Sequence, residues 1–280
     1  MSTFAQALSA AKQHIPAAEA RLLLCEASGH NAAWLVAHDT DDLPVVIEEK
    51  FMDWIARRAA GEPVAYLIGW RDFYEHRFHV APGVLIPRPE TELLIDHGLA
   101  TIAHLEHPRI LDMGTGSGCI AISLALAKPA SEVWALDISH AALSIASANA
   151  ERLGAQVQFR HSDWASALPS EKFSGYFDLI VSNPPYIAPD DIHLSQGDLR
   201  FEPRSALAAD DAGMADLTKI VAIAKTLLKP NGVLLCEHGY DQAERMNILL
   251  KQNAFETQQH LDLSSIIRIS GGINISPAAA

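Results

Sequence analysis

The residues best suited to carry chemistry are four in a row, Asn183, Pro184, Pro185 and Tyr186, which follow an apolar run over residues 177–182. The Asn183 side-chain oxygen and the Pro184 backbone oxygen are two acceptors, and the fixed φ of proline can hold them side by side. Such a pair matches the two hydrogens of a planar NH2 group, in a carboxamide or an exocyclic base amine, and the Tyr186 ring offers a face for that group to pack against. A proline-rich turn after a strand would have the same sequence, so this tetrad (residues 183–186) alone leaves both interpretations open.

A glycine-rich segment upstream favours the functional interpretation. An apolar run over residues 110–113 leads into a G-x-G-x-G loop made of Gly114, Thr115, Gly116, Ser117 and Gly118. Such loops hold nucleotide-like ligands where a parallel strand ends, because glycine lets a ligand touch the backbone. The spacing differs from the dinucleotide-binding G-x-G-x-x-G pattern, and no Gly-Lys-Ser/Thr follows, which excludes a P-loop. A tight turn without a ligand stays the alternative.

Acidic residues follow the next two strand-like runs. Asp137 ends the first of them, 19 residues after Gly118, and a carboxylate there can accept both hydrogen bonds of a ribose diol. The second run leads to Asp163 and Trp164, which could accept from an adenine amine and cover a purine face, although loop and core roles would explain them equally well. Together with the glycine loop and Asn183, these residues follow four successive strands, and ligands bind at that end of open α/β sheets.

Taken together, these features resemble the S-adenosylmethionine-dependent amino-methyltransferases of the Rossmann-like class. Within that class, the chain is similar to the release factor glutamine methyltransferases, the HemK/PrmC family. Four further segments carry this resemblance: residues 62–69 (EPVAYLIG), 86–92 (IPRPETE), 201–207 (FEPRSAL) and 232–239 (GVLLCEHG). The resemblance covers nearly the whole chain.

The resemblance implies an α/β fold, in which a Rossmann-like class I methyltransferase domain with a mainly parallel seven-stranded sheet follows a small helical bundle and a connecting β-hairpin. We expect a helical substrate-binding domain at 1–72, the hairpin linker at 73–88 and the methyltransferase domain at 89–280. The implied reaction transfers a methyl group from S-adenosylmethionine to N5 of the glutamine in the Gly-Gly-Gln (GGQ) motif of peptide chain release factors, which act in translation termination. It leaves S-adenosylhomocysteine and uses no metal.

Each candidate residue has an expected role in that reaction. Asn183 and Pro184 are the catalytic pair, because they would hold the amide nitrogen with its lone pair toward the methyl group and bind it more strongly as it becomes positive. Pro185 and Tyr186 would complete the substrate site around the planar amide. Cofactor contacts are expected from Asp112, Gly114, Thr115, Gly116, Ser117, Gly118, Asp137, Asp163, Trp164 and Asn183.

Three rival functions stay open with unequal support. The tetrad also suits an amino-methyltransferase acting on adenine in DNA or on ribosomal RNA. The net charge of −13 and the lack of Lys/Arg clusters beyond pairs such as Arg57-Arg58 count against it, since nucleic-acid binding needs basic surface. A binding module that only retains the fold is disfavoured by the intact glycine loop, Asp137 and Asn183. A nicotinamide-dependent dehydrogenase is disfavoured by the glycine spacing.

The elements that position these residues can be read from the apolar patterns. The expected N-terminal helices are 4–14, 16–27, 31–37 and 44–60, the last with a buried stripe of Val46, Phe51, Ile55 and Ala59. The expected strands are 109–113, 132–136, 157–160, 177–182, 232–237 and 266–270, and helices are expected at 91–104, 117–127, 140–153 and 215–228. This alternation is typical of a mainly parallel sheet with helices on both faces. The resemblance implies that the final strand pairs antiparallel at the edge of the sheet. Residues 73–85, with a Pro82-Gly83 turn, favour a β-hairpin.

Two segments near the tetrad allow a structural or a functional interpretation. Residues 187–202 form a long polar connection, which we expect to order around the substrate as a lid; a solvated insertion is the alternative. Glu90, Thr91 and Glu92 could line the same cleft, but for Thr91 a helix cap is the favoured interpretation.

Cysteine usage and hydropathy bound the setting. Cys25, Cys119 and Cys236 are widely spaced, which favours reduced thiols in a cytoplasmic protein. His104 and His107 have metal-like spacing but lack a third ligand, so no metal site is expected. No signal peptide, membrane span or direct nucleic-acid contact is expected, and the protein is expected to be a monomer with a frayed end at residues 277–280.

Overall fold

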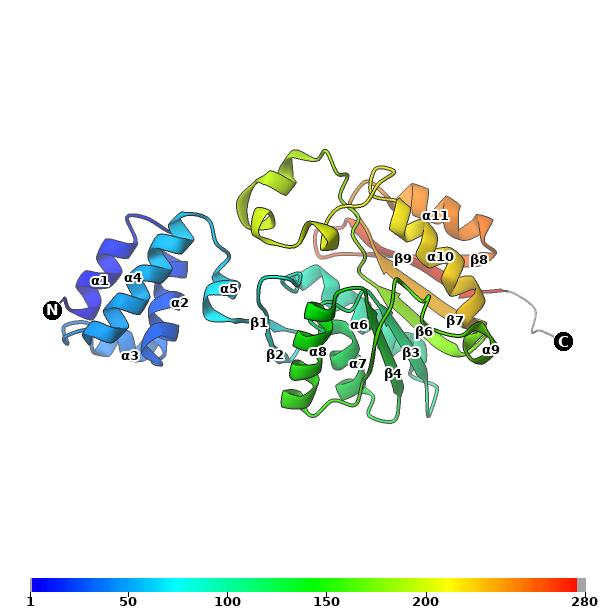
Figure 1. Ribbon diagram of the computed structural model, residues 1–280, viewed down its shortest axis with the longest axis horizontal. Coiled ribbons are helices and arrows are strands. Elements are labelled where there is room, and N and C mark those ends of the chain that lie inside the picture. The colour runs from blue at the N-terminus through cyan, green and yellow to red at the C-terminus, as the bar shows by residue number, and fades with distance from the viewer. Residues whose placement is uncertain (1, 276–280) are drawn as a thin grey trace. The chain divides into compact units, whose positions relative to one another are not determined.

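The computed structural model describes residues 2–275, and the chain divides into two compact units at residues 1–70 and 71–280 (Figure 1). Each unit has buried hydrophobic clusters of its own. The expected frayed end at residues 277–280 lies outside the described residues. Within residues 2–275, no helix is both long and apolar enough to cross a membrane.

The N-terminal unit is helical, as expected. Residues 2–70 contain five helices: α1 (Phe4–Ala11), α2 (Ala17–Ser28), α3 (Ala32–Ala37), α4 (Val45–Ala59) and α5 (Val64–Ile68). The first four correspond to the expected helices, and α5 was not expected because it is only five residues long. A capping box between Thr3 and Gln6 begins α1, and Gly29, with φ 74°, ends α2. These local signals set the helix limits.

The buried face of α4 differs from the expected stripe at two positions. Phe51 and Ile55 are buried, but Val46 is 77% exposed and Ala59 is also exposed, while Trp54 joins the core. Val46 precedes Phe51 by five residues, and at 100° per residue that offset turns it away from the buried face. The core of this unit therefore continues from Phe51 by steps of three and four residues.

The C-terminal unit is built on a mainly parallel sheet. In the part of the chain that the structure describes, this sheet has seven strands in the order β5-β4-β3-β6-β7-β9-β8. The strands are β3 (Arg109–Met113), β4 (Glu132–Asp137), β5 (Gln158–His161), β6 (Phe177–Ser182), β7 (Leu228–Glu237), β8 (Phe255–Leu261) and β9 (Ile267–Asn274). Strands β3 to β7 pair in parallel, and β9 pairs antiparallel with both of its neighbours. The expected parallel sheet is confirmed.

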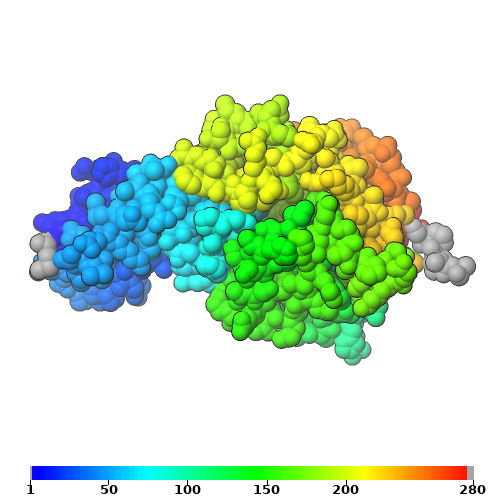
Figure 2. Space-filling model, in the orientation of Figure 1, coloured from blue at the N-terminus to red at the C-terminus, as the bar shows by residue number. Residues whose placement is uncertain are grey.

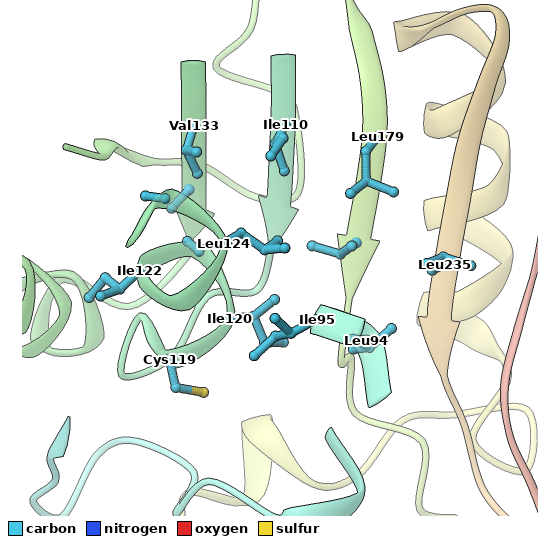
Figure 3. Close-up of a cluster of buried hydrophobic side chains, with 14 of the residues drawn as sticks. Leu94, Ile95, Ile110, Cys119, Ile120, Ile122, Leu124, Val133, Leu179 and Leu235 are labelled. Carbon is cyan, nitrogen blue, oxygen red and sulfur yellow. The ribbon is translucent and has the colours of Figure 1, made fainter. Parts of the chain in front are cut away.

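Helices cover both faces of this sheet (Figure 1). The helices of this unit are α6 (Glu92–Ile102), α7 (Cys119–Ala127), α8 (His140–Leu153), α9 (Ser170–Phe173), α10 (Ala215–Leu227) and α11 (Ala243–Gln252). Neighbouring strand residues point to opposite faces: Ile110 and Leu179 pack with α6 and α7 in one buried cluster (Figure 3), while Leu111 and Ile180 pack with α10 in the other. The strands are thus buried on both sides, which explains their almost continuous apolar sequences.

The connecting hairpin is shorter and earlier than expected. It consists of β1 (Trp70–Phe73) and β2 (His76–His79), so the turn falls at residues 74–75 rather than at Pro82-Gly83. Tyr74 adopts φ 53° there, and the Glu92 carboxylate accepts its backbone N–H at 2.8 Å. A tyrosine in this conformation is not a usual turn residue, and the contact that holds it is distant in sequence.

The final strand was expected at the edge of the sheet, and that position is wrong. β9 pairs antiparallel with β7 as expected, but β8 forms the edge and β9 lies between the two. A Cβ on Gly271 would lie 1.9 Å from Leu234 O, so glycine permits this close approach. β8 escaped prediction because its sequence, FETQQHL, is largely polar, as suits an edge strand.

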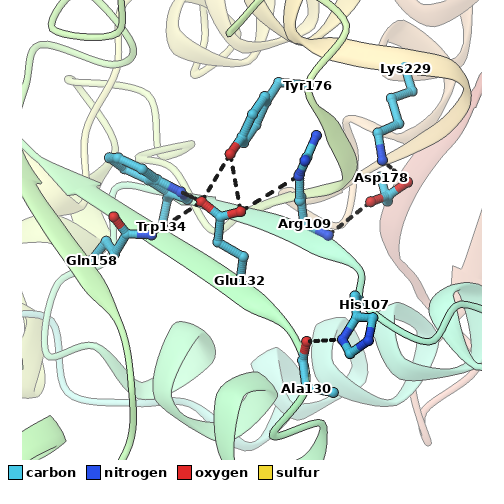
Figure 4. Close-up of polar contacts among 9 residues, drawn as sticks. All are labelled: His107, Arg109, Ala130, Glu132, Trp134, Gln158, Tyr176, Asp178 and Lys229. Atoms are coloured by element: carbon cyan, nitrogen blue, oxygen red, sulfur yellow. Dashed lines mark hydrogen bonds and ion pairs between the residues drawn. The ribbon is translucent and has the colours of Figure 1, made fainter. Parts of the chain in front are cut away.

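Polar side chains tie the amino ends of the strands together (Figure 4). The Asp178 carboxylate accepts the Arg109 backbone N–H at 2.8 Å and pairs with Lys229 Nζ at 2.7 Å, which links β3, β6 and β7. Glu132, at the start of β4, accepts hydrogen bonds from the Tyr176 hydroxyl at 3.0 Å and the Trp134 indole N–H at 2.8 Å. These polar side chains at the amino edge of the sheet bind one another, whereas the candidate site residues lie at the opposite, carboxyl edge.

Candidate active site

A cavity of about 560 Å³ lies at the carboxyl ends of the parallel strands. Its size is within the range of small-molecule sites. Most of the predicted site residues line it: Gly114, Thr115, Gly116, Ser117, Asp137, Asp163, Trp164, Asn183 and Pro185. The space-filling view shows a recess between the green and the yellow surfaces of the C-terminal unit (Figure 2). Four predicted residues, Asp112, Gly118, Pro184 and Tyr186, are not part of the lining.

The glycine loop is held open by backbone hydrogen bonds to β4. The N–H groups of Gly114 and Thr115 both donate to Leu136 O at 2.9 Å. Gly116, with φ 56°, donates its N–H to Asp137 Oδ2 at 2.8 Å. A left-handed residue of this kind favours glycine, so the loop's shape and its contact with Asp137 follow directly from the sequence.

Gly118 has a packing role instead of a place in the cavity wall. It precedes α7 with φ 82°, and a Cβ there would lie 2.8 Å from Ile122 Cδ1 and 3.0 Å from Ala146 Cβ. Those distances are shorter than van der Waals contact, so only glycine lets α7 approach α8 this closely. Gly118 therefore shapes the site from behind the loop.

Asp137 carries a carboxylate whose two oxygens each hold one backbone N–H. Oδ2 accepts from Gly116 and Oδ1 accepts from Ser139, both at 2.8 Å. An ionised carboxylate has about four acceptor positions, so each oxygen can accept one more hydrogen bond from a ligand in the cavity. This arrangement suits a vicinal diol.

Asp112 lies one layer behind the loop. It is fully buried, Oδ2 accepts the Thr115 hydroxyl at 2.7 Å, and Oδ1 has no hydrogen-bond partner among the described residues. Burial raises the pKa of this carboxyl to about 7, against the Thr115 hydrogen bond, which lowers it. Ser117 Oγ is likewise buried without a partner among residues 2–275. These two unpaired oxygens, and the acceptor positions that remain on Asp137, fit a polar, nucleoside-like ligand.

Trp164 stands over the glycine loop in an unusual backbone conformation. Its φ is 47°, and a Cβ on Gly114 would lie 3.6 Å from Trp164 Cζ3. A bulky residue at positive φ is strained, and such strain concentrates at functional sites. The half-buried indole lines the cavity beside the exposed Asp163, as stacking on a planar ring requires.

The tetrad is fixed from several sides. Ser182 Oγ, just before it, donates to Met113 O at 2.6 Å, which joins the ends of β6 and β3. The buried Gln242 donates from Nε2 to Tyr186 O at 2.9 Å. Pro184 is buried between Asn183 and Pro185. The two ends of the tetrad are therefore held by the end of β3 and by Gln242, the residue before α11 (Ala243–Gln252).

The Asn183 side chain has a defined orientation. Its Nδ2 donates to Thr91 Oγ1 at 3.0 Å, which leaves Oδ1 as the acceptor presented to a ligand. Thr91 was expected to cap a helix, but its side chain makes no capping hydrogen bond and lines the cavity. Its hydroxyl donates instead to Glu237 Oε2 at 2.6 Å. Thr91 thus occupies the N-cap position of α6, as expected, without a capping side-chain bond. Of the three residues expected near the cleft, Thr91 lines the cavity, and Glu90 and Glu92 do not.

Glu237 is a site residue that sequence reasoning missed. It ends β7, is 2% exposed, and its Oε1 accepts the Tyr186 hydroxyl at 2.9 Å. Burial raises the pKa of this carboxyl, and hydrogen bonds from Thr91 and Tyr186 oppose that rise. Burial and then the Glu237 charge raise the pKa of the Tyr186 phenol. The signal was available, because an acid at the end of an apolar strand also identified Asp137.

The segment 187–202 is anchored at its far end. The Glu202 side chain is fully buried, accepts the Ile86 backbone N–H at 2.9 Å and pairs with the Arg88 guanidinium. Burial raises the pKa of Glu202, and the neighbouring Arg88 charge opposes that rise. Between these ends the chain forms the short 3-10 turns Ile192–Ser195 and Gly197–Phe201, with Ile192 65% exposed.

No group of three potential metal ligands occurs among the residues described by the structure.

Comparison with known proteins identifies relatives that cover most of the chain. Residues 104–268 match the methyltransferase domain family, and residues 1–69 match the PrmC N-terminal domain family. The release factor glutamine methyltransferase of Bordetella pertussis is 50% identical over 259 residues, covering 92% of this chain and 95% of its own. The protein of the same name from Burkholderia pseudomallei is 45% identical over 266 residues, covering 92% of each chain.

Solved structures agree on the architecture of the sheet and its helices. The hMettl16 catalytic domain, solved with a hairpin ligand, has a TM-score of 0.57 at 16% identity and covers 81% of this chain and 84% of its own. A T. thermophilus 16S rRNA methyltransferase, solved with AdoMet and guanosine, has a TM-score of 0.53 at 22% identity and covers 73% of this chain and 50% of its own. At these identities the likeness establishes the fold, that of the Rossmann-like class I methyltransferases.

Proposed function

Because the chain belongs to the release factor glutamine methyltransferase family, we propose that it transfers a methyl group from S-adenosylmethionine to the side-chain amide nitrogen, N5, of a glutamine in a peptide chain release factor. The observation that carries this proposal is the hydrogen bond from Asn183 Nδ2 to Thr91 Oγ1. This hydrogen bond fixes the orientation of the Asn183 carboxamide, so that its acceptor atom Oδ1 faces the substrate. A carboxamide NH2 is the group that such an acceptor recognises.

The cofactor contacts follow from the polar atoms of the cavity. S-Adenosylmethionine, when bound, supplies a methyl group on an electrophilic sulfonium. Asp137 would accept the ribose hydroxyls, because each of its oxygens retains an acceptor position beside the Gly116 and Ser139 bonds. Trp164 would cover the adenine, and Asp163 would accept from its amine. The unpaired Ser117 Oγ and the unpaired Oδ1 of Asp112 would favour the ammonium end of the cofactor.

The chain's contribution to the chemical step is positioning and charge stabilisation. An amide nitrogen is a weak nucleophile because its lone pair is delocalised into the carbonyl. Asn183 Oδ1 and the Pro184 carbonyl would accept the two N–H bonds and turn the lone pair toward the methyl group. Both acceptors would bind the nitrogen more strongly as it gains positive charge, which lowers the barrier. The cationic product is acidic, so proton loss needs no dedicated base.

The target glutamine is proposed to be that of the Gly-Gly-Gln motif, since a segment without side chains passes easily through a narrow entrance. The N-terminal unit, with its PrmC N-terminal domain match over residues 1–69, would contact the release factor, and residues 187–202 would close over it. A release factor substrate also implies a cytoplasmic enzyme, which we propose acts as a monomer.

The proposal is tested by incubating the purified chain with methyl-labelled S-adenosylmethionine and one of four acceptors. The acceptors are a release factor, its Gly-Gly-Ala variant, DNA and ribosomal RNA. We expect label on the native factor alone, on the motif glutamine by mass spectrometry. Label on nucleic acid, or equal label on the Gly-Gly-Ala variant, would contradict the proposed substrate.

A further inference from the structure

Glu237 occupies the centre of a buried hydrogen-bond network behind the tetrad. Its strand pairs with β6 in parallel, with Cys236 opposite Ser182, so Glu237 lies next to the start of the tetrad. One carboxylate oxygen accepts the Thr91 hydroxyl at 2.6 Å and the other accepts the Tyr186 hydroxyl at 2.9 Å. The network therefore joins three segments that are far apart in the sequence.

The donor and acceptor roles in this network are fixed by the carboxylate. Both carboxylate oxygens of Glu237 accept hydrogen bonds, one from Thr91 and one from Tyr186, so the hydroxyl proton of Thr91 points to Glu237. The remaining lone pairs of Thr91 Oγ1 are then available to accept from Asn183 Nδ2, as observed at 3.0 Å. Without this fixed polarity, the Thr91 hydroxyl could donate to Asn183 Oδ1 and the amide could turn over. The NH2 of Asn183 would then meet the NH2 of the substrate, and two donors repel.

We propose that Glu237 is a positioning residue, which acts through the Thr91 hydroxyl to keep Asn183 Oδ1, rather than Nδ2, directed at the substrate amide. This inference rests on the proposed function. Glu237 is separated from the substrate by Thr91 and Asn183, so it contributes by orienting the catalytic amide and not by touching the reacting nitrogen. Its second hydrogen bond fixes the Tyr186 end of the tetrad in the same way.

The network also explains selection between glutamine and glutamate. The two groups proposed to hold the substrate amide, Oδ1 of Asn183 and the carbonyl of Pro184, are both acceptors. A glutamine NH2 satisfies both, whereas a glutamate carboxylate brings further acceptors and leaves all of them unpaired, which is strongly unfavourable. If Asn183 is free to turn over, its NH2 can donate to a carboxylate, and this discrimination weakens.

The first test removes the hydroxyl of Thr91 without changing the side-chain shape. Thr91→Val should lower kcat about tenfold or more at saturating release factor, the scale of a mis-set catalytic hydrogen bond. Cofactor affinity measured by calorimetry should stay within about twofold. Thr91→Ser restores the hydroxyl and should keep kcat within about threefold of the wild type. Thr101→Val is the matched control, because Thr101 lies in α6 and donates only to His97 O at 2.8 Å.

The second test asks whether Glu237 acts through Thr91. Glu237→Gln preserves volume but replaces one acceptor with a donor, and it should lower kcat about fivefold or more. In the double variant Thr91→Val/Glu237→Gln, little further loss is expected, since both changes break the same relay. A Gly-Gly-Glu variant of the release factor should inhibit the wild type weakly, and it should inhibit Thr91→Val several-fold more strongly.

The outcomes separate this inference from the proposed function. If the wild type labels the release factor but Thr91→Val matches Thr101→Val in kcat and in Gly-Gly-Glu inhibition, the positioning role is overturned and the proposed function stands. If Thr91→Val lowers cofactor affinity and melting temperature along with kcat, the loss is structural and the positioning role is also overturned. It is overturned as well if the losses in kcat of the two single variants add in the double variant. If the wild type labels no release factor, both the proposed function and this inference fall.

Discussion

Replacement of Asp137 tests how this fold holds its cofactor. The carboxylate accepts two backbone N–H groups at 2.8 Å, from Gly116 and Ser139, and has one acceptor position left on each oxygen. Asp137→Ala removes the ribose partner and also releases the glycine loop. Asp137→Asn should weaken cofactor binding as much as Asp137→Ala, because one carboxylate oxygen becomes an NH2 group that faces a backbone N–H donor.

The magnitude follows from the bonds that are lost. One hydrogen bond to a charged acceptor contributes about 1.5–3 kcal/mol, which corresponds to roughly 10- to 150-fold in affinity. We therefore expect both variants to bind S-adenosylmethionine at least about tenfold more weakly in calorimetry. Asp178→Ala is the matched control: Asp178 also accepts a backbone N–H at 2.8 Å, but at the amino edge of the sheet (Figure 4). It should lose stability without losing affinity, and an Asp137 variant with wild-type affinity would refute the assignment.

Three further changes test the surroundings of the site. Gly118→Ala adds a Cβ 2.8 Å from Ile122 Cδ1 at φ 82°, so the free energy of unfolding, measured in denaturant, should fall by about 2–5 kcal/mol. The control Gly154→Ala, with φ 75° and nothing within 4 Å of its added Cβ, should lower it by only about 1–2 kcal/mol. Equal losses in the two variants would contradict the packing role of Gly118. The pKa of Asp112 rises from 3.8 to about 7 on folding, so the native state binds more protons between these pH values and the wild type loses stability as pH rises through them. The stability of Asp112→Asn relative to the wild type should therefore increase by up to about 4 kcal/mol from pH 4 to pH 7.5. Parallel curves of stability against pH for the two proteins would argue against a buried titrating carboxyl. Glu202→Ala leaves the Ile86 N–H and Arg88 without this partner, so the free energy of unfolding should fall by about 1–3 kcal/mol. Proteolysis within residues 187–202 should also become faster. A proteolysis rate equal to that of the wild type would show that this contact does not anchor the segment.

Much of the fold could be predicted because its local signals are strong. The parallel strands are buried on both faces and read as apolar runs, and glycines mark the loop between β3 and α7. The strand-end positions of Asp137, Trp164 and Asn183 then follow from topology, since parallel strands place their carboxyl ends at one edge. The cavity in the structure brings these residues together.

The remainder depends on contacts that the sequence does not mark. Strand β8 and helix α11 carry mixed polar sequences, and their positions are set by packing on β9. The network around Glu237 joins it to Thr91 across 146 positions of sequence, so local capping rules placed Thr91 at the start of α6 but could not identify the partner of its side chain. The Tyr74 turn likewise depends on Glu92, 18 residues further on. Long-range hydrogen bonds thus decided the points at which local patterns failed.

The single-turnover rate of Asn183→Ala tests the central claim most directly. The enzyme variant, saturated with methyl-labelled S-adenosylmethionine and in molar excess over the release factor, would be mixed with that factor, and label on the motif glutamine would be followed in time. Loss of one transition-state hydrogen bond predicts a rate about 10²-fold or more below the wild type, with cofactor affinity within several-fold. A wild-type rate in this variant would contradict the account, because the oxygen proposed to hold the substrate amide would be absent.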